Sequence, residues 1–342
     1  MKKILAMLMA LMMVLSLAAC GGSDAPAADA PAAETPADEA PAAEAPGVSD
    51  ELKFTTGGSQ GTYYGFGSVL AGQITSSTDS TVTAVEGAGT QANIELLDMG
   101  DMDLAFVQSD VMSYAYEGTN LFAEFGKVDC FSTVAALYME QVQIVTCNPD
   151  IKTVADLAGK SVSIGAAGSG VYYNAIDVLG AYGLTEKDIN PTYQNFGDSA
   201  EALQDGKIDA AFVVAGAPTT AITSLAASKP VYLVSLDDEH IDALLQASPY
   251  YSKNVIPADV YGLESDCTTV AVGAVVVARD DVSEQDVYNF VSGIFENVDT
   301  ITTAHAKGAE LDLEFAASVT SVPYHPGAAK YFAEKGLTVP TK

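Results

Sequence analysis

Two long runs of apolar, largely β-branched residues constrain the fold of this 342-residue chain more than any other feature. They span residues 134–146 and 268–278, and each is typical of one extended strand. Around them, short strands alternate with helices, which predicts parallel sheets covered by helices. One run leaves the first group of elements and the other leaves the second. We therefore predict an α/β chain with two lobes, joined by two hinge strands, and a ligand cleft between them.

The predicted lobes divide the globular body, which starts near residue 51. This body is longer than one hydrophobic core usually serves, which favours two lobes. Lobe I combines residues 51–140 and 272–342, and lobe II spans residues 141–271. Besides the two long runs, the hydrophobic spacing predicts strands at residues 52–56, 81–85, 104–107, 161–166, 192–196, 208–214 and 231–236. It predicts helices at residues 63–74, 91–99, 109–116, 171–182, 199–204, 218–227, 284–305, 311–317 and 327–334, with Ser109 and Thr153 as caps.

The first twenty residues have the pattern of an export signal. Lys2 and Lys3 precede an apolar run over residues 4–17, which is too short to span a bilayer as a stable helix. The ending LAAC, with Cys20 last, resembles a bacterial lipobox, in which the signal is cut before a lipid-bearing cysteine. We expect a lipoprotein anchored to the outer face of the cell membrane through Cys20. The alternative is a plain signal peptide.

Residues 21–50 have a composition that does not support a folded core. They are mostly alanine, proline, aspartate and glutamate, without aromatic side chains. Such a segment buries too little apolar surface to offset the entropy of ordering it. We predict a disordered tether between the anchor and the body.

The charge of the chain excludes some partners. The formal net charge is −30, and Arg279 is the only arginine. Nucleic-acid binding needs lysine and arginine to displace counterions, so we expect no nucleic-acid partner. Adhesion of the body to anionic lipid is disfavoured for the same reason.

The remaining cysteines are Cys130, Cys147 and Cys267, an odd set in an exported chain. Three buried thiols and one disulfide with a free thiol both fit this number, and the sequence does not choose between them. No CxxC spacing occurs, so a zinc site is not expected. No other metal and no cofactor is assigned.

Two glycine-rich loops occupy equivalent places in the two predicted lobes. They are GGSQGT at residues 57–62 and GAAGSG at residues 165–170, each between a strand and a helix. Glycines let backbone N–H groups approach an anion, and the helix N-terminus adds positive potential. Ser59, Thr62 and Ser169 add hydroxyl donors. Neither loop is a nucleotide motif, so the pair predicts that the cleft binds a small anionic ligand.

An enzyme is the competing class, and the histidines argue against it. His240, His305 and His325 lie outside any HExxH motif or nucleophile elbow. As a lone histidine, His325 is typical of a structural or surface group. No catalytic residue is therefore assigned.

Five ordered blocks, covering about residues 52–337, resemble the TAXI family of solute-binding proteins of TRAP transporters. They are GGSQGTYYGFGSVLAGQI, EGAGTQANIELLDMGDMDLAFVQSDV, VADLAGKSVSIGAAGSGVYYNAIDVLGAYGL, DGKIDAAFVVAGAPTTAI and VPYHPGAAKYFAEKGL. The resemblance implies a periplasmic-binding-protein fold, type II-like. It implies capture of a small carboxylate or amino acid, such as glutamate or 2-oxoglutarate, and delivery to a TRAP permease driven by an ion gradient. The alternative is a ligand sensor that presents its closed form to a membrane receptor kinase.

The same resemblance implies a set of ligand contacts. They are Ser59, Gln60, Thr62, Tyr63, Gln91, Asn93, Gln108, Ser109, Gly168, Ser169, Gly170, Val171, Ala217 and Pro218. Two positions depart from the pattern of the family. Val171 replaces a threonine and removes a hydroxyl, and Thr90-Gln91 replaces the commoner Gly-Ser with bulkier residues. These departures leave the identity of the ligand open.

Overall fold

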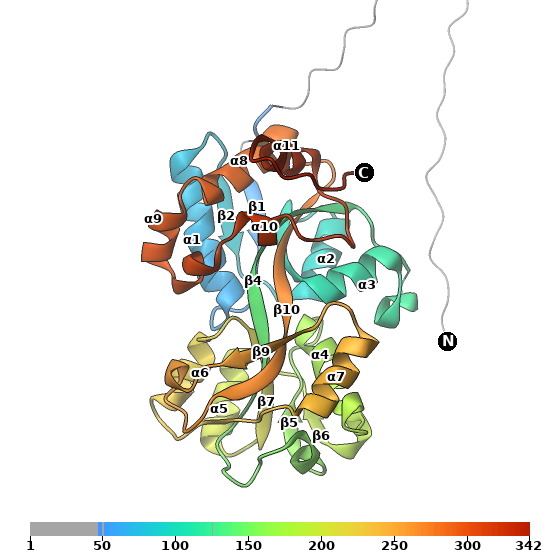
Figure 1. Ribbon diagram of the computed structural model, residues 1–342, viewed down its shortest axis with the longest axis vertical. Coiled ribbons are helices and arrows are strands. Elements are labelled where there is room, and N and C mark those ends of the chain that lie inside the picture. Colours follow the sequence, from blue (N-terminus) through green and yellow to red (C-terminus); the bar gives the residue numbers. More distant parts are fainter. Residues whose placement is uncertain (1–46, 50, 125) are drawn as a thin grey trace, which may run out of the picture. The chain divides into compact units, whose positions relative to one another are not determined.

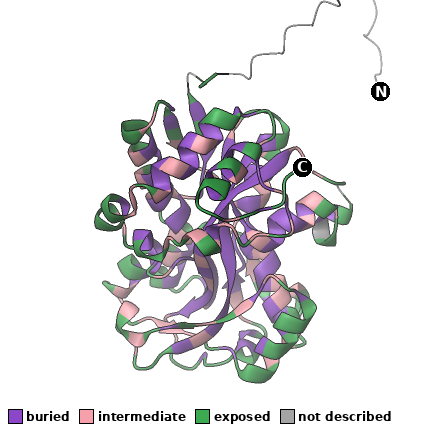
Figure 2. Cartoon of the chain, turned by 45° about the horizontal axis from the view of Figure 1, so that its top comes forward, coloured by how far each residue is buried: buried purple, intermediate pink, exposed green. Residues whose placement is uncertain are grey.

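The computed structural model describes residues 47–49, 51–124 and 126–342. The predicted signal peptide, Cys20 and almost all of the predicted tether therefore lie outside the described residues. The described residues belong to one compact unit. Its strands run through the middle as the most deeply buried part, and helices cover them (Figures 1 and 2).

One mixed sheet of ten strands carries the fold. Along its main path the strands follow the order β2-β1-β3-β10-β4-β7-β5-β6, while β8 pairs with β4 and β9 pairs with β10. The strands are β1 (Leu52–Thr55), β2 (Val82–Val85), β3 (Leu104–Gln108), β4 (Phe131–Thr146), β5 (Ser161–Ser163), β6 (Asn190–Thr192), β7 (Ala210–Ala215), β8 (Tyr232–Leu233), β9 (Ser252–Ile256) and β10 (Cys267–Arg279).

The two long strands β4 and β10 join the two halves of the fold. They pair antiparallel, from Phe131 opposite Arg279 to Gln141 opposite Ala271. Near Gln141, β4 begins to pair with β7, while β10 exchanges its pairing with β3 for pairing with β9. Both strands therefore run from one lobe into the other (Figure 1). The predicted fold class, with two α/β lobes and two hinge strands, is confirmed.

The first lobe is built on the parallel strands β1, β2 and β3. Its main core packs α1 and α8 against the sheet, with Phe54, Phe66 and Phe290 fully buried. Its helices are α1 (Thr62–Ser77), α2 (Thr90–Asp98), α3 (Ser109–Glu117), α8 (Glu284–Phe295), α9 (Val298–Ala304), α10 (Leu313–Ala316) and α11 (Pro326–Glu334), with 3-10 turns η1 (Asn120–Ala123) and η5 (Ala306–Glu310).

The second lobe is built on the parallel strands β5, β6 and β7. Val162, Val178 and Phe212 are among the buried residues of its core. Its helices are α4 (Gly170–Ala181), α5 (Phe196–Asp205), α6 (Thr220–Ala226) and α7 (Asp238–Ala247), with 3-10 turns η2 (Val154–Leu157), η3 (Glu186–Asp188) and η4 (Ala258–Val260).

The structure corrects several expected element bounds. The strand expected at 192–196 ends at Thr192, and α5 already begins at Phe196, because the side chain of Asn195 accepts from the N–H of Asp198 and starts the helix. The helix expected at 284–305 is two helices with Asn297 between them. Ser109 is the first residue of α3 and not its cap.

Three other features bear on earlier expectations. Thr153 does cap a helical turn, through a reciprocal capping box with Asp156. Cys130, Cys147 and Cys267 are free thiols, of which Cys267 is buried and the other two are partly exposed. His325 is buried and structural, because its Nδ1 accepts from the N–H of Gly327 and caps α11.

Among the described residues, no helix is both long and apolar enough to cross a membrane.

Candidate functional site

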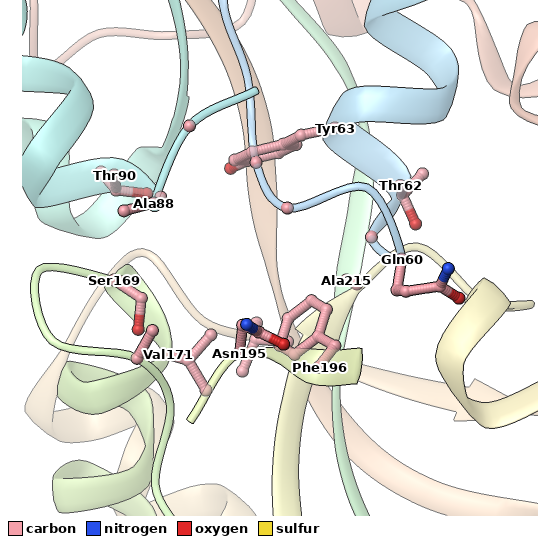
Figure 3. Close-up of a pocket in the computed structure, with 18 of the residues that line it drawn as sticks. Gln60, Thr62, Tyr63, Ala88, Thr90, Ser169, Val171, Asn195, Phe196 and Ala215 are labelled. Atoms are coloured by element: carbon pink, nitrogen blue, oxygen red, sulfur yellow. The ribbon is translucent and has the colours of Figure 1, made fainter. Parts of the chain in front are cut away.

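A cavity of about 380 Å³ lies between the lobes, at the ends of the two glycine loops. Its size falls at the lower end of the roughly 300–1,000 Å³ that small-molecule sites occupy. Figure 3 shows Tyr63 and Thr90 on one side, and Ser169, Val171, Asn195 and Phe196 on the other. The lining residues are Gly57, Gly58, Ser59, Gln60, Gly61, Thr62, Tyr63, Glu86, Gly87, Ala88, Gly89, Thr90, Gln108, Glu140, Ala166, Ser169, Gly170, Val171, Tyr193, Asn195, Phe196, Gly197, Asp198, Val214 and Ala215.

Two backbone amides of the first glycine loop, residues 57–62, already have hydrogen-bond partners. The N–H of Ser59 donates to Glu86 Oε1 at 2.9 Å, and the N–H of Gly61 donates to the carbonyl oxygen of Gly58 at 2.9 Å. The side chain of Ser59 is exposed. This loop therefore offers fewer free donors than its glycine content suggests.

The second glycine loop, residues 165–170, differs in its backbone and in its side chains. Gly165 has a φ of +92°, a left-handed conformation that glycine adopts without strain. Ser169 precedes α4 and is 6% exposed, and its Oγ has no hydrogen-bond partner among the described residues. A buried hydroxyl at a helix N-terminus without a partner is suited to hydrogen bond with an anionic group of a ligand.

Gln108 connects the cavity lining to a buried polar network. Its Nε2 donates to Asn174 Oδ1 at 2.9 Å, and Asn174 Nδ2 donates to Asp110 Oδ2 at 2.7 Å. Asp110 Oδ2 accepts from the Asn174 amide and so fixes its orientation, which in turn fixes that of Gln108. A Cβ added at Gly170 would lie only 1.4 Å from Gln108 Oε1, so only glycine fits at position 170. We call residues 108, 110, 174, 177 and 251 the Asp110 network.

Burial alters the acidity of Asp110. The carboxyl is fully buried, which raises the pKa of Asp110 to about 7. The N–H of Val111 and the amide of Asn174 lower this pKa, whereas the nearby carboxyl of Asp177 raises it. Tyr251 completes the network by donating to Asp177 Oδ2 at 2.9 Å.

Glu140 is the buried acid of the cavity. It lies in β4, is 2% exposed, and its Oε2 accepts from the hydroxyl of Tyr63 at 2.7 Å. The ring of Tyr63 stacks on that of Phe106, with centroids 4.6 Å apart, which holds the hydroxyl in place. Burial is the main cause that raises the pKa of Glu140 well above its usual range.

The lobes touch on several sides of the cavity. Thr62 Oγ1 donates to the carbonyl oxygen of Gly216 at 2.9 Å. The N–H of Ala221 donates to the carbonyl oxygen of Gln60 at 3.2 Å. Beside the second glycine loop, the N–H of Ala92 donates to the carbonyl oxygen of Gly168 at 2.9 Å. The structure therefore represents a closed arrangement of the lobes.

Eight of the fourteen residues predicted as ligand contacts line the cavity. They are Ser59, Gln60, Thr62, Tyr63, Gln108, Ser169, Gly170 and Val171. The hydroxyl of Thr62 already bonds to Gly216, and that of Tyr63 to Glu140. The unpartnered hydroxyl of Ser169 is thus the clearest free donor among these eight.

The other six predicted residues lie outside the lining. Asn93 is fully buried and bonds to Thr55 and to the carbonyl oxygens of Thr56 and Phe106. Ser109 Oγ accepts from the N–H of Gly273. Gln91 and Gly168 take part in contacts between the lobes, with Tyr173 and Ala92.

Ala217 and Pro218 complete this group. The N–H of Ala217 donates to Gln141 Oε1 at 3.0 Å, next to the cavity but not in its lining. Gln141 lies in β4, so this bond ties the segment after β7 to a hinge strand.

The sequence interpretation missed several acidic, amide and aromatic residues of the lining. These include Glu86, Glu140, Tyr193, Asn195, Phe196 and Asp198. Glu140 had a usable signal, because it is the only charged residue in the apolar run 134–146. A lone acid in a strand buried on both faces needs a reason to be there.

The arginine of the chain does not line the cavity. Arg279, at the end of β10, pairs with Asp103 and Asp281. Within the described ranges, no Lys, Arg or His lines the cavity, and no group of three or more His, Cys, Asp or Glu side chains could hold a metal ion.

The comparisons with known proteins assign the chain to a family. The sequence pattern of the NMT1-like family matches residues 54–336, which is nearly the whole body. The chain belongs to the NMT1-like family. The narrower resemblance to the TAXI proteins is not decided by this match.

A solved structure with a TM-score above 0.5 supports the fold of this NMT1-like protein, and two further structures are similar to a lesser degree. A protein of Bordetella bronchiseptica RB50 is similar at 16% identity and a TM-score of 0.51, over 83% of this chain and 88% of that one. The alkanesulfonate-binding protein SsuA from Xanthomonas axonopodis pv. citri, bound to MOPS, is 15% identical over 85% and 92%, with a TM-score of 0.47. The ligand-binding core of GluR0 with L-glutamate is 12% identical over 78% and 100%, with a TM-score of 0.48.

Proposed function

We propose that this protein is an extracytoplasmic solute-binding protein that captures a small carboxylate or amino acid and delivers it to a membrane permease. The observation that carries the proposal is the cavity between the two lobes, with the unpartnered hydroxyl of Ser169 beside the start of α4. Opening and closing of two lobes around a ligand is a recurring device. We propose the same lobe boundaries as the sequence predicts, residues 51–140 with 272–342 and residues 141–271.

The permease partner is proposed from the sequence blocks. They resemble the TAXI proteins of TRAP transporters, whose permeases use an ion gradient, and we propose a partner of this kind. We propose a ligand of the size of glutamate or 2-oxoglutarate for the cavity of about 380 Å³.

Native mass spectrometry of the purified full chain in detergent tests the binding function. We expect a small acid or amino acid to be retained and to be released unchanged after denaturation. Turnover of that compound during prolonged incubation, abolished by a substitution in the cavity, would instead indicate an enzyme.

The second candidate function is a ligand sensor that presents its closed form to a membrane receptor kinase. The contacts between the lobes around the cavity favour it as much as they favour transport, because both use the closed form. Pull-down of the ligand-bound protein with membrane extract separates the two. Recovery of a permease subunit supports transport, and recovery of a receptor kinase supports sensing.

We propose that a lipid on Cys20 anchors the protein outside the cell membrane. The Cys20→Ala variant should then leave the membrane fraction while its body stays folded, because the lipid is the only attachment proposed. A variant that stays membrane-bound after a high-salt wash would exclude this anchor.

A further inference from the structure

The charges that line the cavity are all of one sign. Its three ionisable carboxyl groups belong to Glu86, Glu140 and Asp198, and within the described ranges no basic side chain joins them. Glu86 and Asp198 are exposed at the edge, whereas Glu140 is buried. A ligand that brings only negative charge would meet these groups without a compensating cation.

Glu140 keeps one carboxyl oxygen available to a ligand. Its Oε2 accepts from Tyr63, and among the described residues no donor lies within hydrogen-bond distance of Oε1. The nearest basic group, Lys307, is almost fully buried and already pairs with Glu310 at 2.5 Å. Glu140 is therefore a buried acid in the lining of the cavity that has no ion-pair partner of its own.

Resting on the proposed function, we propose that Glu140 determines specificity by binding a cationic nitrogen of the ligand through its carboxylate. The cavity then takes an amino acid and discriminates against the oxo acid with the same carbon skeleton. An ammonium group donates short, charge-assisted bonds to a carboxylate, whereas a keto oxygen has no proton to donate. The carboxylate of the same ligand would accept from Ser169.

This assignment has a consequence for protons. The groups that face Glu140 are the hydroxyls of Tyr63 and Tyr138, the ammonium of Lys307 and the carboxyl of Asp110. Burial raises the pKa of Glu140 well above its usual range, so the empty cavity favours the protonated carboxyl. An ammonium group that binds beside it favours the ionised carboxylate instead. Binding of an ammonium group should therefore release protons to solvent, and binding of the oxo acid should not.

The test compares matched pairs of probes on the full chain in detergent. Calorimetry measures binding of the twenty common amino acids and of their 2-oxo acids, including L-glutamate with 2-oxoglutarate. We expect at least one amino acid to bind about 10- to 150-fold more tightly than its oxo acid, the range of one hydrogen bond to a charged group. Titration in two buffers of different ionisation enthalpy should show proton release with that amino acid and not with its oxo acid.

Substitution assigns the effect to Glu140. We expect Glu140→Gln to lose the preference for the amino acid and the proton release. Glu201→Gln, an exposed acid on α5 outside the cavity lining, is the matched control and should keep both. If Glu140→Gln does not fold, the proton count of the parent protein still decides the question.

The outcomes separate the two proposals. Oxo acids that bind as tightly as their amino acids, without proton release, would overturn the role of Glu140 and leave the proposed function standing. A preference that persists in a folded Glu140→Gln variant would overturn that role as well. If no acid of either set binds, the proposed ligand class fails, and the role of Glu140 fails with it.

Discussion

The two glycine loops resemble each other in sequence, yet the structure uses them differently. In the first loop, residues 57–62, the amides of Ser59 and Gly61 already have partners. In the second, residues 165–170, Ser169 Oγ is buried without a partner and Gly170 lies directly against Gln108. Two glycine-rich loops at equivalent places therefore differ in use: one is bonded within its own lobe, and the other faces the cavity and the opposite lobe.

The largest difference should appear when a methyl group is added to each loop. In Gly170→Ala the new Cβ would lie 1.4 Å from Gln108 Oε1, so the Gln108 amide must move and release Asn174. We expect a loss of about 3 kcal/mol or more in the free energy of unfolding, and loss of ligand binding. At Gly58 the new Cβ would have only Glu86 Oε1 near it, at 4.0 Å.

Urea unfolding and calorimetry check this prediction, with Gly58→Ala as the control. We expect the control to bind like the parent. Equal effects of the two substitutions would mean that the loops are equivalent after all.

The Asp110 network beneath the second loop should make stability depend on pH. Burial raises the pKa of Asp110 to about 7 in the folded protein, above its ordinary value of 3.8. The folded state therefore binds this proton more tightly than the unfolded state does. The stabilisation that protonated Asp110 contributes is complete below pH 3.8 and is lost as pH rises through 7. Between pH 5 and 8 this loss should amount to about 2–3 kcal/mol.

The Asp110→Asn variant isolates that contribution, because Asn cannot titrate but still accepts from Asn174. We expect its free energy of unfolding, measured in urea, to fall less than that of the parent between pH 5 and pH 8. Parallel pH curves for the two proteins would rule out Asp110 as the titrating group.

Serine-to-alanine substitutions compare the hydroxyls of the two loops. Ser169→Ala removes the buried hydroxyl without a partner, and we expect ligand affinity to fall by about 30-fold, or about 2 kcal/mol. Ser59→Ala removes an exposed hydroxyl and should change affinity by less than about threefold, close to 0.5 kcal/mol. Calorimetry on the retained ligand measures both, and a larger effect at Ser59 would reverse the comparison.

The smallest expected effect concerns the hydrogen bond from the Ser59 N–H of the first loop to Glu86. Glu86→Ala removes the acceptor of the Ser59 N–H, and we expect it to cost about 0.5–1 kcal/mol of stability, because the site is exposed to water. Thermal unfolding detects a change of this size. Ligand affinity that improves in this variant would show that the freed amide can join the site.

The fold could be predicted because its signals are local. The apolar runs 134–146 and 268–278 appear as β4 and β10, and hydrophobic spacing placed α1 and α4 close to their observed bounds. Local signals failed where a single polar residue decides where a helix begins or ends. Asn195 starts α5 earlier than expected, and Asn297 lies between α8 and α9. The short β9 and the helix α7 were not predicted at all.

The site was predictable only in part, because a loop sequence does not reveal which of its groups already have partners. The two loops and Tyr63 were placed near the ligand from sequence, and the structure brings them to one cavity. The Ser59 amide bonds to Glu86, and the Asn93 side chain bonds to groups of the core. Both sets of partners lie far away in the chain.

The sequence by itself determined the two lobes, the two connecting strands and the glycine loops, since these depend on periodicity and on residues adjacent in the chain. Only the tertiary structure decided which polar groups remain free. It placed Glu140 opposite Tyr63, 77 positions away, and Gln108 against Gly170 of the other lobe. The physical reason is that burial and pairing, which set the charge and the hydrogen-bond capacity of a side chain, come from neighbours that the fold supplies.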